Sequence, residues 1–296
     1  MNVLIIGSKG QLGFELLRTR PESFEVTGCD VAEVDIRDPL SVVRLVSTLQ
    51  PALILNVAAY TAVDRAESER DLAFEVNARG AGNLAEAAAS IGARMIHLST
   101  DFVFSGDSGR PYRPEDPPAP ISVYGLSKAE GERRVLEPLG ERATILRTSW
   151  LYSIHGRNFV KTMLAKMDAG DPLRVVTDQA GAPTWGYGLA RAIWELAAIP
   201  SLPNVLHWSD AGVASWYDFA VAIHEEALAR GMVRAPVDIR PVPGSEYPTA
   251  AQRPPYSALD SSRTWTLLGR VAPHWRVSLR AMLAELESEG GLRKEE

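Results

Sequence analysis

The sequence predicts an α/β fold in which a parallel sheet carries helices on both faces. Short, almost continuously apolar runs alternate with longer amphipathic runs through the first half of the chain. Strands with one face in water would alternate apolar and polar residues, so these strands should be covered on both sides. Regular strand–helix alternation of this kind is typical of parallel sheets.

The expected elements follow from this alternation. Strands are expected at residues 3–6, 24–30, 52–57, 94–98 and 143–146, and helices at 11–18, 40–49, 71–91 and 123–136. Beyond residue 150 the alternation loosens, with strands expected at 205–208 and 237–242 and helices at 216–229 and 277–289. We predict a sheet domain over 1–150, its sheet completed by part of 172–200, and a smaller domain over 151–296 whose last segment, 290–296, is frayed.

Composition excludes several classes of function. The chain has 296 residues and a net charge of −6, whereas nucleic-acid binding needs a basic surface. Its apolar runs are shorter than the roughly 20 residues of a membrane span, and the N-terminus lacks the basic region of a signal peptide. The one cysteine, Cys29, permits no internal disulfide and fits a reducing compartment. We expect a cytoplasmic protein without membrane or nucleic-acid partners.

A glycine-rich turn, residues 7–13 (GSKGQLG), joins the first strand to the first helix. Gly7 and Gly10 would let the backbone turn tightly and bring N–H groups to a pyrophosphate, and Gly13 would let helix and strand pack closely. The helix N-terminus adds partial positive charge. The turn predicts a Rossmann-like, doubly wound sheet that binds a dinucleotide, with a purely structural turn as the alternative.

Asp30 ends the second predicted strand, 17 residues after Gly13. An acidic residue at this place hydrogen-bonds the adenosine ribose of NAD and repels the 2′-phosphate of NADP. The alternative is a solvated aspartate or a helix cap. Asp35 and Ile36 lie further along the same edge and could flank the adenine.

Tyr124 and Lys128 stand four residues apart in a predicted helix, on one face. A nearby ammonium stabilises phenolate and should lower the tyrosine pKa, which allows proton exchange with a substrate oxygen during hydride transfer. Only five of the 31 Lys and Arg residues are lysines, so lysine here hints at a need for a compact, tunable ammonium. A surface helix pair is the alternative.

Residues 99–101 (STD) end the fourth predicted strand, at the sheet edge where ligands bind in such folds. The Thr100 hydroxyl could hydrogen-bond a carbonyl oxygen or Tyr124, and the alternative is a helix cap or turn. We expect His97, within the strand, to be simply buried. The sequence has no His/Cys cluster for zinc and no Gly-x-Ser-x-Gly elbow for ester hydrolysis.

Segments through most of the chain resemble the dTDP-4-dehydrorhamnose reductase family, of the extended short-chain dehydrogenase type. They are 7–13 (GSKGQLG), 56–64 (NVAAYTAVD), 99–104 (STDFVF), 124–128 (YGLSK), 147–152 (RTSWLY), 178–184 (DQAGAPT) and 253–254 (RP). The resemblance implies reduction of the C4 ketone of dTDP-4-dehydro-L-rhamnose to dTDP-L-rhamnose by hydride from NADPH or NADH. The smaller domain would then bind the nucleotide-sugar substrate.

The resemblance also implies the roles of individual residues. Tyr124 would donate the proton, Lys128 would bind the nicotinamide ribose, and Thr100 would tune Tyr124. The sugar would meet Thr100, Asp101 and Trp150. The cofactor would contact Gly7, Gly10, Gln11, Leu12 and Gly13 through its phosphates, Asp30, Asp35 and Ile36 through its adenosine half, and Ala58, Ala59 and Tyr60 beyond the third strand.

One departure concerns a metal. Some relatives form a dimer around Mg²⁺ held by glutamates, and Glu15 matches one such position. Tyr187 stands where those relatives have a glutamate, so we expect no metal-linked dimer, and a monomer or a homodimer remains possible.

Two other classes of protein are similar to this sequence. Nucleotide-sugar epimerases and 4,6-dehydratases share the fold, but the dehydratases carry a glutamate for elimination where this chain has Phe102. The regulatory subunit of methionine adenosyltransferase is also similar and binds a partner without turnover. Retention of Thr100, Tyr124 and Lys128 together favours an enzyme.

Overall fold

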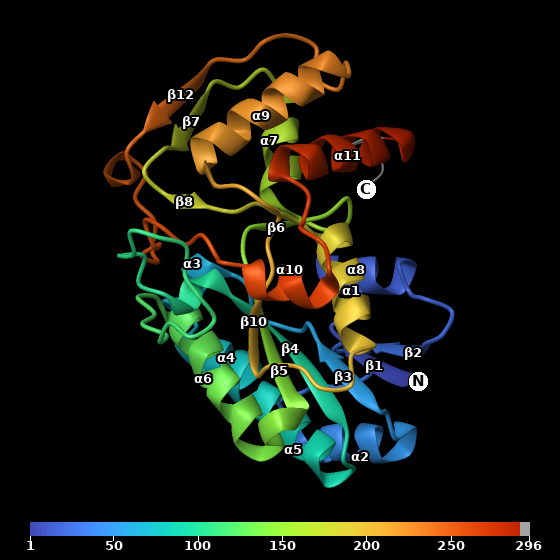
Figure 1. Cartoon of the computed structure of the whole chain (residues 1–296). Helices are drawn as coiled ribbons and strands as arrows, with labels where there is room; N and C mark the ends of the chain where they lie inside the picture. Colours follow the sequence, from blue (N-terminus) through green and yellow to red (C-terminus); the bar gives the residue numbers. More distant parts are fainter. Residues whose placement is uncertain (291–296) are drawn as a thin grey trace.

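Six parallel strands form the central sheet of the computed structural model, which describes residues 1–290 (Figure 1). The order across the sheet is β10-β5-β4-β3-β1-β2. The bounds are β1 (Asn2–Ile6), β2 (Glu25–Cys29), β3 (Leu53–Asn56), β4 (Arg94–Thr100), β5 (Ala143–Thr148) and β10 (Val205–His207). Strand β2 is added on one side of β1 and the later strands on the other, so the switch point lies between β1 and β3.

Helices cover both faces of this sheet (Figure 1). Val3 and Ile5 pack toward one face, under α1 (Gln11–Arg18) and α8 (Gly186–Ala197). Leu4 and Ile6 pack toward the other, under α2 (Pro39–Leu49), α5 (Ala81–Ser90) and α6 (Val123–Leu139). Alternate residues of one strand thus enter two apolar cores, as the period of two requires. The predicted Rossmann-like, doubly wound class is confirmed.

The expected sixth strand is wrong. Residues 172–200 contribute β7 (Leu173–Val176), which pairs with β12 (Ile239–Val242) outside the main sheet, and α8, which covers that sheet. The free edge of β5 is filled instead by β10. Edge pairing is decided by which run the chain can return to that edge, and both runs are short and contain valine and leucine, so their composition does not distinguish them. The domain boundary at residue 150 stays a prediction.

A smaller lobe lies above the carboxyl ends of the strands (Figure 1). Its core is one apolar cluster contributed mainly by α7 (Phe159–Asp168), α9 (Trp216–Ala229) and α11 (Trp275–Ser288). Two short pairs, β6 (Leu151–Tyr152) with β9 (Thr184–Trp185) and β8 (Ala180–Gly181) with β11 (Ala214–Ser215), lie beneath it, and α10 (Ser262–Leu268) lies between the lobes.

The helix expected over 71–91 is interrupted. It consists of α4 (Arg70–Phe74), a π-helical segment (Glu75–Gly80) and α5, and the short α3 (Val63–Ala66) precedes it. Such π-helical segments often occur at functional sites. Within residues 1–290, we find no helix with the length and apolar character needed to cross a membrane. Residues 291–296, nearly all of the segment expected to be frayed, lie outside the described part.

Candidate active site

The glycine turn connects β1 to α1 at the switch point. Gly7 has φ +89°, and a Cβ added there would lie 2.7 Å from the Ala58 backbone nitrogen. A Cβ on Gly13 would lie 2.2 Å from the Gly7 carbonyl oxygen. No side chain caps α1, whose N-cap is Gly10, so its first N–H groups, which include those of Gln11 and Leu12, are free for an anion. The turn therefore fits a dinucleotide pyrophosphate.

Of the three predicted adenosine residues, Asp30 contacts this turn, whereas Asp35 and Ile36 contact residues outside it. Asp30 Oδ2 accepts the Lys9 backbone N–H at 2.9 Å, which holds the carboxylate against the glycine turn. Asp35 forms a bidentate pair with Arg37, with Nη2 2.6 Å from Oδ2. Ile36 is buried, and a Cβ on Gly80 would lie 2.7 Å from its Cγ1. The structure thus brings Asp30 to the turn and places Ile36 against the π-helical segment.

The loop after β3 contains Ala58, Ala59 and Tyr60 and is held by a residue that sequence reasoning missed. Asn77 Oδ1 accepts the Tyr60 N–H at 2.8 Å, and Asn77 Nδ2 donates to the Tyr60 carbonyl at 3.0 Å. The same Nδ2 donates to Ser127 Oγ on α6 at 3.0 Å. The π-helical segment that carries Asn77 therefore ties the predicted cofactor loop to the helix of Tyr124. An asparagine within an alanine-rich stretch was the only signal that the sequence offered.

Two glycines let α6 approach its neighbours closely. A Cβ on Gly125 would lie 2.2 Å from the Phe102 carbonyl oxygen, and one on Gly131 would lie 2.1 Å from the Asn77 carbonyl oxygen. Close packing against the segment after β4 places Tyr124 beside Phe102, with ring centroids 5.5 Å apart, at the end of β4 that carries Thr100. The buried face of α6 carries both Tyr124 and Lys128, so the four-residue spacing places them as expected.

The ionisation of Tyr124 differs from the expectation that Lys128 would lower its pKa. Burial raises the pKa of Tyr124 to about 12, the negative charge of Asp101 adds to this, and a hydrogen bond with Thr100 opposes it. Lys128 Nζ instead donates to the Leu98 carbonyl of β4 at 2.7 Å. Tyr124 therefore keeps its proton at neutral pH, as a proton donor must.

Lys128 is itself perturbed, because its side chain is only 2% exposed. Burial lowers the pKa of Lys128 to about 8, against the opposing charge of Glu132. Glu132 is buried in a bidentate pair with Arg147, with an Nη2–Oε2 distance of 2.6 Å, and accepts from Ser99 at 2.5 Å. This network satisfies the buried charges one turn beyond Lys128.

His97 is buried within β4, as expected, and its ring also contacts Lys128. Its Nε2 is 3.5 Å from Lys128 Nζ. Asn56 Oδ1 accepts the Ala58 N–H at 3.2 Å, so Asn56 Nδ2 is the donor toward His97 Nδ1 at 3.0 Å. Neutral His97 then carries its proton on Nε2, facing Lys128. Two facing donors disfavour the ammonium, in the same direction as burial.

Asp101 and Trp150 lie where the two lobes meet. Asp101 is buried, and its Oδ1 accepts from Thr100 Oγ1 at 3.0 Å. Its Oδ2 has no hydrogen bond of good geometry, although nearby Ser257 favours the ionised form. Burial outweighs that effect and raises the pKa of Asp101 to about 6. A small hollow beside it is lined by Phe102, Trp150, Gln179, Trp216, Arg253, Pro254 and Ser257.

The residues that the resemblance relates to Mg²⁺ do not fit a metal. Glu15 is fully buried, forms an ion pair with Arg18 and accepts from Ser153 Oγ at 2.6 Å. Arg18 also pairs with Glu285, and its guanidinium lies 4.9 Å from the Tyr187 ring centroid. Across residues 1–290, no group of three or more His, Cys, Asp or Glu side chains could hold a metal ion. The arginine cation already neutralises these carboxylates.

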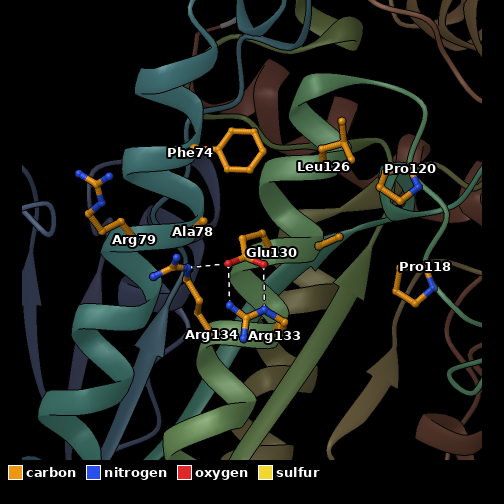
Figure 2. A pocket seen from close by; sticks show the side chains of 10 residues that line it. Phe74, Ala78, Arg79, Pro118, Pro120, Leu126, Glu130, Arg133 and Arg134 are labelled. Carbon is orange, nitrogen blue, oxygen red and sulfur yellow. Dashed lines mark hydrogen bonds and ion pairs between the residues drawn. The ribbon is translucent and has the colours of Figure 1, made fainter.

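A second hollow, of about 540 Å³, lies on the outer side of α6 (Figure 2). Figure 2 shows Glu130 hydrogen-bonded to Arg133 and Arg134, with Phe74 and Leu126 above them. The Arg133 guanidinium helps to lower the pKa of Glu130 to about 2, so this carboxylate stays ionised. None of the predicted site residues lines this hollow, and its size does not make it the active site.

Comparison with known proteins agrees with this geometry. The family model "RmlD substrate binding domain" matches residues 1–288. The chain is 41% identical to the spore coat polysaccharide biosynthesis protein SpsK of Bacillus subtilis, over 97% of this chain and 98% of that protein. It is 38% identical to the dTDP-4-dehydrorhamnose reductase of Escherichia coli K12, over 97% and 98%.

A solved structure of a dTDP-4-dehydrorhamnose reductase is also similar to this chain. The dTDP-4-dehydrorhamnose reductase of Bacillus anthracis, crystallised in complex with NADP, superposes with a TM-score of 0.90 at 39% identity, covering 96% of this chain and 99% of that one. The glycine turn, the Thr100–Tyr124 contact and Lys128 thus occur on a fold shared along almost the whole chain. This chain belongs to the dTDP-4-dehydrorhamnose reductase family.

Proposed function

We propose that this enzyme reduces the C4 ketone of dTDP-4-dehydro-L-rhamnose to dTDP-L-rhamnose with NADPH or NADH. The observation that carries the proposal is the placement of Tyr124 and Lys128 on the buried face of α6, beside Thr100 at the carboxyl end of β4. The names of the relatives in Escherichia coli and Bacillus anthracis support the same substrate.

The residues divide the chemistry among them. NAD(P)H, when bound, supplies a hydride to C4. The ketone oxygen then gains negative charge, and Tyr124 donates its proton to that oxygen, which completes the alcohol. Thr100 holds the tyrosine hydroxyl, and Lys128 provides a cation for the nicotinamide ribose and for the charge left on Tyr124. Asp101 and Trp150 would contact the sugar.

The turn of residues 7–13 and the loop of Ala58, Ala59 and Tyr60 would hold the cofactor. The relative from Bacillus anthracis was crystallised with NADP. In this chain Asp30 lies at the turn and argues for competent use of NADH, since its carboxylate would repel a 2′-phosphate. Phe102, in the place of a catalytic glutamate, argues against dehydration.

The reaction is tested by incubating the protein with dTDP-4-dehydro-L-rhamnose and each reduced nicotinamide in turn. We expect loss of reduced-nicotinamide absorbance and formation of dTDP-L-rhamnose, identified by chromatography against the authentic sugar nucleotide. Omission of the sugar nucleotide is the control. Oxidation of the nicotinamide without this product, or no oxidation with either cofactor, would refute the proposal.

We further propose that the enzyme works in the cytoplasm, as a monomer or homodimer, without nucleic-acid or membrane partners. The support is the acidic net charge and the lone, buried Cys29. Sedimentation of the purified protein at several concentrations distinguishes the two assembly states.

A further inference from the structure

Trp150 has an unusual backbone. Its φ is +48°, and among residues 1–290 the only other non-glycine residue with positive φ is Gln50, at the C-terminal cap of α2. Bulky side chains rarely adopt this left-handed conformation, which persists only where the surroundings impose it. Trp150 is not a helix cap, since it links β5 to β6. Its conformation therefore needs a cause in the packing.

An aromatic stack is one such cause. The rings of Trp150 and Trp216 are 3.5 Å apart between centroids and 3° from parallel. Trp216 is the first residue of α9, where a capping box between Ser215 and Asp218 fixes the helix start. Phe159 packs on Trp216, with their ring centroids 4.6 Å apart. The stacking partner of Trp150 is thus held in place from two sides.

A glycine is the second cause. A Cβ added to Gly181 would lie 2.7 Å from both Cε2 and Nε1 of Trp150, so only glycine leaves room for this indole. Gly181 pairs with Ala214 in the β8–β11 ladder, and β11 leads directly into Trp216. The β8–β11 ladder therefore contains Gly181, which contacts the Trp150 indole, and ends next to Trp216, which stacks on that indole.

The indole of Trp150 faces the hollow between the lobes. Trp150 and Trp216 both line the hollow between the lobes, together with Phe102. Phe102 in turn packs on Tyr124 at 5.5 Å. The strained tryptophan thus belongs to a wall that begins at the proton donor and ends in the smaller lobe.

We propose that Trp216 and Gly181 are positioning residues that hold Trp150 in its left-handed conformation as the aromatic wall of the sugar subsite. This inference rests on the proposed function, because it assumes a sugar nucleotide in the hollow. Without the stack, the Trp150 backbone relaxes and its indole leaves the wall. Binding of the sugar should then weaken while binding of the nucleotide alone is kept.

The test compares three variants with the wild type. Trp216→Ala removes the stack, Trp216→Phe keeps an aromatic ring, and Gly181→Ala displaces Trp150 while Trp216 stays. Tyr217→Ala is the matched control, because it removes the adjacent aromatic side chain of α9. Calorimetry measures the Kd of dTDP-L-rhamnose and of dTDP. Circular dichroism of the free protein measures the paired positive and negative bands, here called the tryptophan couplet, that two stacked indoles produce.

We expect Trp216→Ala and Gly181→Ala to lose the tryptophan couplet and to weaken dTDP-L-rhamnose binding by about tenfold, with dTDP nearly unchanged. KM should rise more than kcat falls. Trp216→Phe should restore most of the binding, and Tyr217→Ala should behave as wild type. The two substitutions lie in different elements, Gly181 in β8 and Trp216 in α9, so one remains informative if the other fails to fold.

Wild-type affinity for dTDP-L-rhamnose in a variant that has lost the couplet would overturn the inference. A uniform loss of both ligands would also overturn it, because it indicates general damage. Failure of the proposed function is recognised separately: wild-type protein would then bind dTDP-L-rhamnose no more tightly than dTDP and would show no turnover. In that case the couplet still tests whether Trp216 and Gly181 hold Trp150 in place, but the assignment of Trp150 to a sugar subsite is refuted.

Discussion

Replacing Lys128 should abolish most of the activity and yet stabilise the free protein at neutral pH. Lys128→Met keeps much of the side-chain volume and removes the ammonium. Turnover and nicotinamide binding should both fall, because the ammonium is assigned to the ribose and to the charge on Tyr124. The free energy of unfolding should increase, because burying the ammonium of a lysine that is 2% exposed costs desolvation free energy in the wild type.

The size of the gain follows from the pKa. Burial lowers the pKa of Lys128 from 10.5 to about 8, which corresponds to about 3 kcal/mol at ~1.4 kcal/mol per pKa unit. The folded-state pKa lies below the unfolded value, so the penalty is complete below about pH 8 and disappears above about pH 10.5. The substitution also leaves the Leu98 carbonyl without a donor, at about 1 kcal/mol. The net gain should be about 2 kcal/mol at pH 7.

Urea unfolding of the free protein at pH 7 and at about pH 10 measures this gain. The difference between Lys128→Met and wild type should be stabilising at pH 7 and should shrink or reverse at the higher pH. Lys166→Met, on an exposed position of α7, is the control and should change stability little at either pH. A variant that is less stable than wild type at pH 7, by the same amount at both pH values, would refute the reasoning.

Three further predictions concern the chemistry. Tyr124→Phe keeps the ring and deletes the proton, so kcat should fall by about 10²–10⁴ with nicotinamide Kd largely kept; a near-normal rate would assign the proton to another group. Asp30→Ala should raise the KM for NADH more than that for NADPH, and equal effects would remove Asp30 from the ribose site. EDTA should leave turnover nearly unchanged, because Arg18 already neutralises Glu15; a loss that Mg²⁺ restores would contradict this.

Local patterns predicted the parts of the site that depend on short spacings. The predicted helices at 11–18 and 216–229 coincide with α1 and α9. The glycine turn follows β1, and Tyr124 and Lys128 share the buried face of α6, since four residues make about one helical turn. The alternation of apolar runs predicted the parallel sheet because both of its faces are covered.

Long-range contacts were beyond these patterns. The strand beside β5 could not be chosen from the apolar runs of β7 and β10, because pairing depends on how the chain returns to the edge. The pKa of Tyr124 depends on burial and on the direction of Lys128 Nζ, which points to the Leu98 carbonyl. Neither is encoded in a spacing of four residues. Trp216, 66 positions from Trp150, gave no sign of its role.

Two of the features that local rules failed to predict share a physical character, because each is unfavourable when considered alone. A buried ammonium at Lys128 and a tryptophan at φ +48° would each relax if their surroundings allowed it. Trp150 is stacked on Trp216 and lies against Gly181, and Lys128 donates to the Leu98 carbonyl near the buried Glu132–Arg147 pair. Such local conflicts are expected where function rather than stability determines the residue. Their position near the carboxyl ends of β4 and β5 supports the proposed location of the chemistry with an argument that does not depend on the resemblance.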